Sequence, residues 1–127
     1  MKQPNNIKFN RDIADYGLYT RYILHKMIIA LKYANGCGTK LSWWIPDKIL
    51  GVDIETACNI HDIECQLAKN KDDLIQASNN FYSNMKKMIT FRSGYLFYAR
   101  IAMAKVYVKA VNFFWLEKYS KERNFND

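Results

Sequence analysis

Ala57-Cys58-Asn59-Ile60-His61-Asp62-Ile63-Glu64-Cys65 is the stretch of sequence that decides the fold of this chain. Cys58, His61 and Cys65 are spaced three and four residues apart, so on a helix their side chains share a face, while Asp62 points about 100° away. A histidine that projects inward is suited to deprotonate a water molecule, because its ordinary pKa of about 6.5 lies near physiological pH. The neighbouring carboxylate suits a hard cation such as calcium, which binds carboxylate and backbone carbonyl oxygens together.

The residues before this stretch predict a helix followed by a long loop. Apolar residues recur at three- and four-residue steps from Arg11 to Ala34, which indicates an amphipathic helix, and Asn35-Gly36 ends it. Residues 37–52 read as a loop rich in turn-forming residues. Glycines such as Gly36 and Gly38 allow backbone carbonyls to turn toward a cation. Loops of this length in a small domain usually have a function.

Three more helices follow from the apolar spacing. The first runs over residues 54–68 with Asp53 as its N-cap. The second starts at Asp72 or Asp73 and continues to about residue 90, and a turn at residues 92–94 separates it from the third, over residues 95–119. No strand of useful length with a period of two is visible. The sequence therefore predicts one all-α domain over residues 1–127, with three to four helices around one core.

The charge of the chain is concentrated in its last third. The formal net charge is +7, and residues 86–123 hold nine cations against Glu117 and Glu122: Lys86, Lys87, Arg92, Arg100, Lys105, Lys109, Lys118, Lys121 and Arg123. Such a surface suits an anionic membrane, near which each cation contributes on the order of 1 kcal/mol, or nucleic acid. No nucleic-acid motif accompanies the charge, so we expect an anionic phospholipid membrane surface as the partner. A solvated helix face is the alternative.

Two motifs of this chain, taken together, resemble those of a known enzyme family. Asn35-Gly36-Cys37-Gly38, followed some twenty residues later by residues 57–62, is similar to the calcium loop and catalytic helix of secreted phospholipases A2. The resemblance is closest to the small prokaryotic and fungal type, and it continues through residues 81–86 and 107–111. It implies a phospholipase A2-like fold with two long antiparallel core helices and a calcium-type loop before the catalytic helix.

The resemblance also implies an activity. A protein of this family hydrolyses the sn-2 acyl ester of glycerophospholipids with calcium, and His61 would be the general base that activates water. Calcium would be bound by Asp62 together with loop residues, and would polarise the oxyanion as a Lewis acid. In the implied metal site the loop ligands are Asn35, Gly36 and Gly38. The family pattern further implies a disulfide between Cys37 and Cys58.

Three positions depart from the family pattern. Ser78 stands where the family has an aspartate that orients the catalytic histidine, and a hydroxyl can accept the ring N–H but supplies no charge to stabilise an imidazolium. Asn35 replaces a loop aspartate, which weakens calcium binding. Cys65 replaces a tyrosine that supports the aspartate. The competing hypothesis is therefore a catalytically impaired phospholipase A2-like module that binds lipid or serves a structural role.

Other interpretations of the same residues stay open at this point. Cys37, Cys58, His61 and Cys65 also supply the ligands of a tetrahedral Cys3His zinc site. His61 is alternatively an ordinary histidine of the core. Trp43 and Trp44 suit a lipid interface, where tryptophan is favoured, and they equally suit packing against the first helix.

The sequence shows no apolar run of the roughly 18 residues that a spanning helix needs, and residues 1–10 hold no signal-peptide segment. We expect a protein that is secreted or acts at a membrane surface. Without a visible signal peptide, it would be processed, exported by a non-classical route or encoded by a virus. The Trp-Trp-Ile-Pro segment at residues 43–46 is also similar to an uncharacterised family of small phage proteins, which agrees with the last of these.

Overall fold

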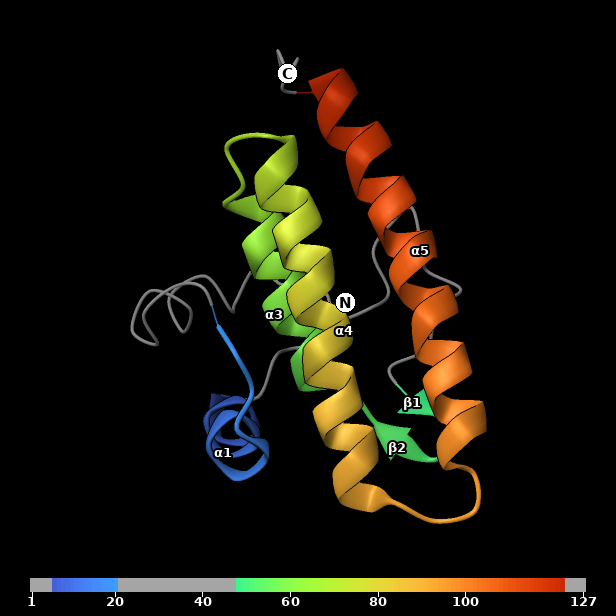
Figure 1. Ribbon diagram of the computed structural model, residues 1–127. Helices are drawn as coiled ribbons and strands as arrows, with labels where there is room; N and C mark the ends of the chain where they lie inside the picture. The colour runs from blue at the N-terminus through green and yellow to red at the C-terminus, as the bar shows by residue number, and fades with distance from the viewer. Residues whose placement is uncertain (1–5, 21–47, 123–127) are drawn as a thin grey trace.

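The described part of the protein is mostly helical. The computed structural model describes residues 6–20 and 48–122. The elements are α1 (Asn6–Tyr16), β1 (Lys48–Ile49), β2 (Val52–Asp53), α3 (Glu55–Gln66), α4 (Lys71–Arg92) and α5 (Phe97–Glu122). The chain reverses direction between α3 and α4 and again between α4 and α5, so α4 lies between two antiparallel neighbours (Figure 1). The all-α prediction is confirmed.

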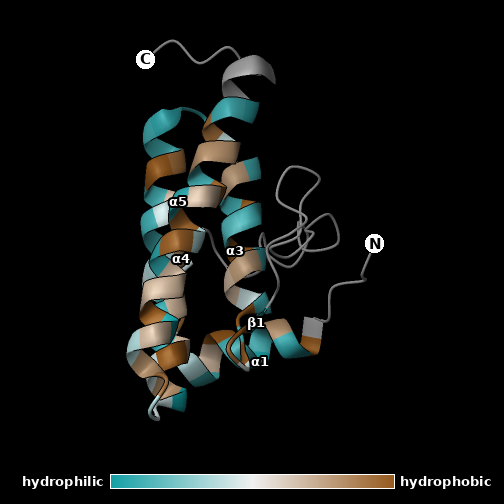
Figure 2. Ribbon diagram, turned by 90° about the vertical axis from the view of Figure 1, so that its right-hand side faces the viewer, coloured by the Kyte–Doolittle hydropathy of each residue, from teal (hydrophilic) through white to brown (hydrophobic). Residues whose placement is uncertain are grey.

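Helix α1 is much shorter than the helix predicted over residues 11–34. It ends at Tyr16, because Gly17 has a φ of +65° and the Leu18 amide donates to the Ile13 carbonyl at 3.0 Å. This is the Schellman arrangement, in which a left-handed glycine closes the last turn. The continuous helix was therefore wrong at residues 17–20, and residues 21–34 lie outside the described part. The short α1 runs crosswise under one end of the bundle (Figure 2).

A small hairpin stands where the sequence predicted only loop. Strands β1 and β2 are antiparallel, with Lys48 paired to Asp53 and Ile49 to Val52. Leu50 and Gly51 form the turn between them, both with positive φ, +44° and +86°. Strands of two residues are too short to show an alternating pattern in the sequence, which is why the prediction missed them.

The helix starts agree in part with the predicted caps. The N-cap of α3 is Ile54, which makes no side-chain capping hydrogen bond, so the predicted cap was one residue too early. The side chain of Asp53 still accepts a hydrogen bond from the Glu55 amide at 2.9 Å, in the first turn of the helix. At α4 the N-cap is Asn70, whose side chain accepts from the Asp73 amide at 2.9 Å. The prediction of Asp72 or Asp73 as the cap was wrong, because both fall in the first turn, where carboxylates favour the helix dipole instead.

A buried arginine joins two turns at one end of the bundle. Arg100 is 6% exposed; its Nε and Nη2 donate to the Leu50 carbonyl at 3.1 and 2.8 Å, and its Nη1 donates to the Ser93 carbonyl at 3.0 Å. Among the described residues, Leu50 and Ser93 are the two non-glycine residues with positive φ. One guanidinium thus stabilises both left-handed turns and holds the hairpin against α5.

None of the helices in residues 6–20 and 48–122 combines the length and the apolar character that crossing a membrane requires.

Candidate functional site

Helix α3 is buried on every side, including its polar residues. Its buried residues run without interruption from Glu55 to Cys65. Burying a polar group without a partner costs a few kcal/mol, so such groups are normally hydrogen-bonded or serve a function. Six polar side chains of α3 are buried: Glu55, Thr56, Asn59, His61, Asp62 and Glu64.

Ionic contacts fix the first turn of α3 against α1. The Thr56 hydroxyl donates to Oδ2 of Asp12 at 2.6 Å. Lys8 of α1 places its Nζ 3.3 Å from Asp12, 3.3 Å from Asp53 and 3.6 Å from Glu55. Three carboxylates around one half-buried lysine hold α3 in one rotation about its axis. The direction in which the later residues of α3 point is therefore set by the fold.

His61 lies in the interior, between α3 and α4. It is 3% exposed, and its ring stacks on that of Phe81 from α4, with centroids 4.6 Å apart and planes at 23°. Burial lowers the pKa of His61 from its ordinary 6.5 to about 3, because the charged imidazolium is removed from water. The ring is therefore neutral at physiological pH and able to accept a proton.

The neighbour of the His61 ring is a thiol. Sγ of Cys65 lies 3.4 Å from Nε2 of His61, and within the described ranges it is the ring's hydrogen-bond partner. If the thiol donates to Nε2, the ring hydrogen sits on Nδ1; if Nε2–H donates to sulfur, Nδ1 carries the lone pair. A carboxylate accepts only and would enforce the second state. The thiol allows both, so it controls the tautomer of His61 less strictly.

Ser78 does not fill the orienting position predicted for it. Its hydroxyl donates to Oδ1 of Asn112 on α5 at 2.9 Å, and no hydrogen bond joins it to His61 in the part of the chain that the structure describes. Helix α4 lies between α3 and α5, so a polar side chain on α4 can find a hydrogen-bond partner on either neighbour (Figure 1). Ser78 takes its partner on α5, and His61 is left with Cys65.

Asp62 has the chemistry that a calcium ligand needs. Its carboxylate is 2% exposed, and Oδ2 accepts a hydrogen bond from Nε2 of Gln66 at 2.9 Å, a contact that orients the side chain. A buried, oriented carboxylate fits a hard cation. The other predicted ligands, Asn35, Gly36 and Gly38, lie outside the described residues. Residues 6–20 and 48–122 by themselves bring together no cluster of three or more His, Cys, Asp or Glu residues suited to a metal.

The cysteines have different states. Cys58 is disulfide-bonded, whereas Cys65 is a buried thiol. Since a disulfide sulfur is not a thiolate ligand, the Cys3His zinc alternative is contradicted. The predicted partner, Cys37, lies outside the described residues, as do Trp43 and Trp44, the predicted lipid-interface residues.

Two contact residues of the site were not predicted. Phe81 was part of the resemblance only, and the structure shows that its ring covers His61. Asn112 is the partner of Ser78. The signal for Asn112 was a single polar residue inside an apolar run, Val111 to Leu116, on a helix that packs against its neighbour. Such a residue usually has a polar partner on the facing helix.

No protein-family model matches this chain, and no curated protein or solved structure does either. The chemistry of the site therefore has to be argued from its own residues. These are a neutral buried base, a buried carboxylate at the next position on the helix, and a disulfide three residues before the base.

Proposed function

We propose that this protein has a phospholipase A2-like fold and hydrolyses the sn-2 acyl ester of glycerophospholipids, with His61 as the general base. The observation that carries the proposal is the buried His61-Asp62 pair on α3, in a helix antiparallel to α4 (Figure 1). Burying a histidine and an aspartate at adjacent positions costs stability, and buried titratable groups of this kind gather at functional sites. The disulfide at Cys58 agrees with the family pattern.

The residues of the chain have separate tasks in this reaction. His61 is neutral and accepts a proton from water through Nδ1, the nitrogen that does not face Cys65. Phe81 holds the plane of the ring by stacking. Asp62 and the predicted loop residues 35–38 would hold calcium, which supplies Lewis-acid polarisation of the ester carbonyl when bound. Asp62 keeps its orientation through Gln66.

Turnover by this site should be slow. A protonated His61 gains no stabilisation from a carboxylate, since its neighbour is the Cys65 thiol, and the low pKa of about 3 makes the ring a weak base. In triad-type sites, replacing the orienting aspartate reduces the rate by roughly 10⁴-fold. We therefore expect measurable hydrolysis that is several orders of magnitude slower than in a site where a carboxylate accepts a hydrogen bond from the ring of the base.

The hydrogen bond between Ser78 and Asn112 favours a second candidate. If the orienting position is used to join α4 to α5, the same fold serves as a lipid-binding or structural module without catalysis. The two candidates differ in the role of His61. In the module His61 matters for packing, whereas in the enzyme it matters for fatty-acid release.

The first test is fatty-acid release from mixed-chain phospholipid vesicles, with calcium or with a chelator. Wild type should release sn-2 fatty acid only when calcium is present. His61→Gln, which keeps a side chain of similar size, should release none under either condition. Equal release by both proteins, insensitive to calcium, would falsify the enzymatic proposal. Calcium-independent binding to vesicles without release from either protein supports the module instead.

A gain-of-function variant tests the orienting position. Cys65→Asp places a carboxylate beside Nε2 of His61, where the thiol now lies 3.4 Å away, and we expect it to raise the rate of the wild type at least about 100-fold if the base is His61. Ser83→Asp is the control, because Ser83 is an exposed residue of α4, and it should leave the rate unchanged. A double variant Cys65→Asp/His61→Gln should show no gain. Equal rates for all of these proteins count against His61 as the base.

A further inference from the structure

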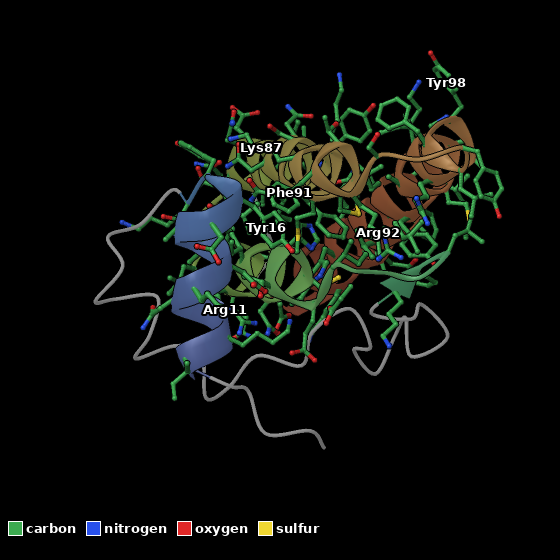
Figure 3. The ribbon with its side chains drawn as sticks, turned by 90° about the horizontal axis from the view of Figure 1, so that it is seen from below. Arg11, Tyr16, Lys87, Phe91, Arg92 and Tyr98 are labelled. Atoms are coloured by element: carbon green, nitrogen blue, oxygen red, sulfur yellow. The ribbon has the colours of Figure 1, made fainter. Side chains whose placement is uncertain are left out.

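The outer side of α5 carries large apolar side chains that the rest of the described protein leaves uncovered. Tyr98 is 83% exposed, Val106 60% and Phe113 61%. At 3.6 residues per turn these three side chains lie within about 80° of one another on the helix surface. They form a stripe along the helix, and Figure 3 shows its first member, Tyr98, projecting away from the body of the protein.

Helix α5 is apolar on both its sides. The side that packs against the rest of the fold buries Ala104, Tyr107, Val111 and Trp115. A helix with an apolar stripe on one side is normally polar on the other, and one that is apolar all around is normally covered all around. The outer stripe is therefore a surface that residues 6–20 and 48–118 leave open to solvent, of the kind that marks interaction sites.

The charge along the outer side of α5 identifies the partner. Lys105 and Lys109 are exposed and fall within the same arc of about 100° as the apolar stripe. From Leu74 to Leu116 the sequence holds six lysines and arginines and no aspartate or glutamate. The exposed acidic residue nearest to the stripe on α5 is Glu117, at its C-terminal edge. A surface that combines apolar side chains with an excess of cations is complementary to an anionic layer over an apolar one.

A second copy of this chain is a poorer match to the same surface. In a symmetric pair the same patch of each copy faces the other, so the lysines of both copies, Lys105 and Lys109, would be brought into one interface. Like charges brought together in this way oppose association. An anionic phospholipid bilayer, in contrast, offers headgroups to the lysines and an acyl boundary to tyrosine, valine and phenylalanine.

We propose that the outer face of α5, made of Tyr98, Val106 and Phe113 with Lys105 and Lys109, docks this protein onto an anionic phospholipid bilayer. The α5 face lies on a different helix from the His61 site on α3, and its docking requires no turnover. The inference rests on the proposed function in one respect, because action on phospholipid is what favours a bilayer over other anionic partners.

Flotation with phosphatidylcholine vesicles, with and without phosphatidylserine, tests the apolar part of the face. Val106→Glu/Phe113→Glu should weaken binding to phosphatidylserine vesicles at least about tenfold. Ile75→Glu is the control, since Ile75 is an exposed apolar residue of α4, 46% exposed, and it should change binding less than about twofold. All three proteins should keep the same helicity and thermal midpoint, since the changed positions are exposed. Equal binding by the double variant and the wild type overturns the proposal.

The cationic part of the face needs a control of equal charge. Lys105→Glu/Lys109→Glu should weaken binding about tenfold or more, since each cation near an anionic surface contributes on the order of 1 kcal/mol. Lys69→Glu/Lys86→Glu makes the same change in net charge at exposed positions outside α5 and should retain most of the binding. Equal losses in the two variants show attraction by net charge alone and contradict a defined face.

Insertion of the face is measured with a fluorescent label. Phe113→Cys and Ile75→Cys give exposed thiols for an environment-sensitive dye, whereas Cys65 is fully buried. The dye at position 113 should shift to the blue on anionic vesicles, and the dye at position 75 should not. Sedimentation adds a further check. If the wild type is a dimer that Val106→Glu dissociates, and if the wild type does not bind vesicles, the face belongs to an interface with a second copy and the proposal is overturned.

A monomeric substrate separates this inference from the proposed function. Short-chain phospholipid dispersed below its micellar concentration reaches His61 without a bilayer. Val106→Glu/Phe113→Glu should hydrolyse it at the wild-type rate while binding vesicles poorly. If wild type floats with anionic vesicles through α5 but hydrolyses neither substrate, the enzymatic proposal fails and the docking face stands. If wild type hydrolyses the substrates and Val106→Glu/Phe113→Glu binds vesicles as well as wild type does, the docking proposal fails and the enzymatic proposal stands.

Discussion

Helices α3 and α5 depart in opposite directions from the usual division of side chains between inside and outside. Helix α3 buries six polar side chains, among them His61 and Asp62. Helix α5 exposes three large apolar ones, Tyr98, Val106 and Phe113. Positions that break the ordinary rule are where function is expected, because each costs stability that the fold has to recover elsewhere. The two proposals made above place chemistry on the inside of α3 and recognition on the outside of α5.

The largest expected effect is a difference in the free energy of unfolding between alanine variants of two phenylalanines, one buried and one exposed. Phe81 is 1% exposed and stacks on His61, whereas Phe113 is 61% exposed. Phe81→Ala should lower the free energy of unfolding by about 3–5 kcal/mol, because it leaves a cavity beside the ring. Phe113→Ala should change it by less than about 0.5 kcal/mol. Urea unfolding measures both, and a similar loss for the two variants would show that α5 is covered in the free protein.

The next effect concerns the polar residue that α5 does bury. Arg100→Met removes the donors that the carbonyls of Leu50 and Ser93 share, and we expect a loss of about 2–3 kcal/mol. Arg100→Lys should recover less than half of this, since an ammonium group does not span both carbonyls as the planar guanidinium does. Lys105→Met, at an exposed position of the same helix, is the control. Equal free energies of unfolding for Arg100→Met and the control would show that the hydrogen bonds from Arg100 to the Leu50 and Ser93 carbonyls do not stabilise the fold.

A smaller effect appears on acidification. Burial lowers the pKa of His61 to about 3, so below its ordinary pKa of 6.5 the unfolded chain binds a proton that the folded chain does not. The contribution of neutral His61 to the free energy of unfolding is complete above pH 6.5 and decreases as the pH falls toward 3. Between pH 7.5 and pH 5 the loss should be about 2 kcal/mol. His61→Gln should lack this part of the slope, and identical slopes in thermal or urea unfolding would mean that His61 is accessible to water.

Much of the helical frame could be predicted from the sequence. Apolar residues at three- and four-residue steps gave helices over residues 54–68 and 95–119, and the structure has Glu55–Gln66 and Phe97–Glu122. The first helix was wrong because apolar periodicity continued past Gly17, whose left-handed conformation ends α1. The sequence pattern records which residues are apolar, but not where a glycine is used to stop a helix.

The composition of the site could be predicted better than its contacts. His61, Asp62 and Cys58 follow from helical spacing and from the resemblance, since all three lie on one short segment. The partner of Ser78 does not, because Asn112 is 34 residues away and faces it only through the packing of α4 on α5. The thiol beside Nε2 of His61 was visible in the spacing of four residues. That Cys65 is the hydrogen-bond partner of the ring is a finding of the structure, in which Ser78 bonds to Asn112 instead.

The contact of Arg100 with two turns has a consequence for how the protein opens locally. The hairpin turn at Leu50 and the connection after Ser93 are far apart in the sequence, yet both depend on the same guanidinium. Segments that share a stabilising group lose it together, so the amide hydrogens of Val52 and Ser93 should exchange with solvent at a common rate. The lower end of the bundle then behaves as a single cooperative unit, and α5 cannot separate from α4 there without releasing the hairpin that leads into α3.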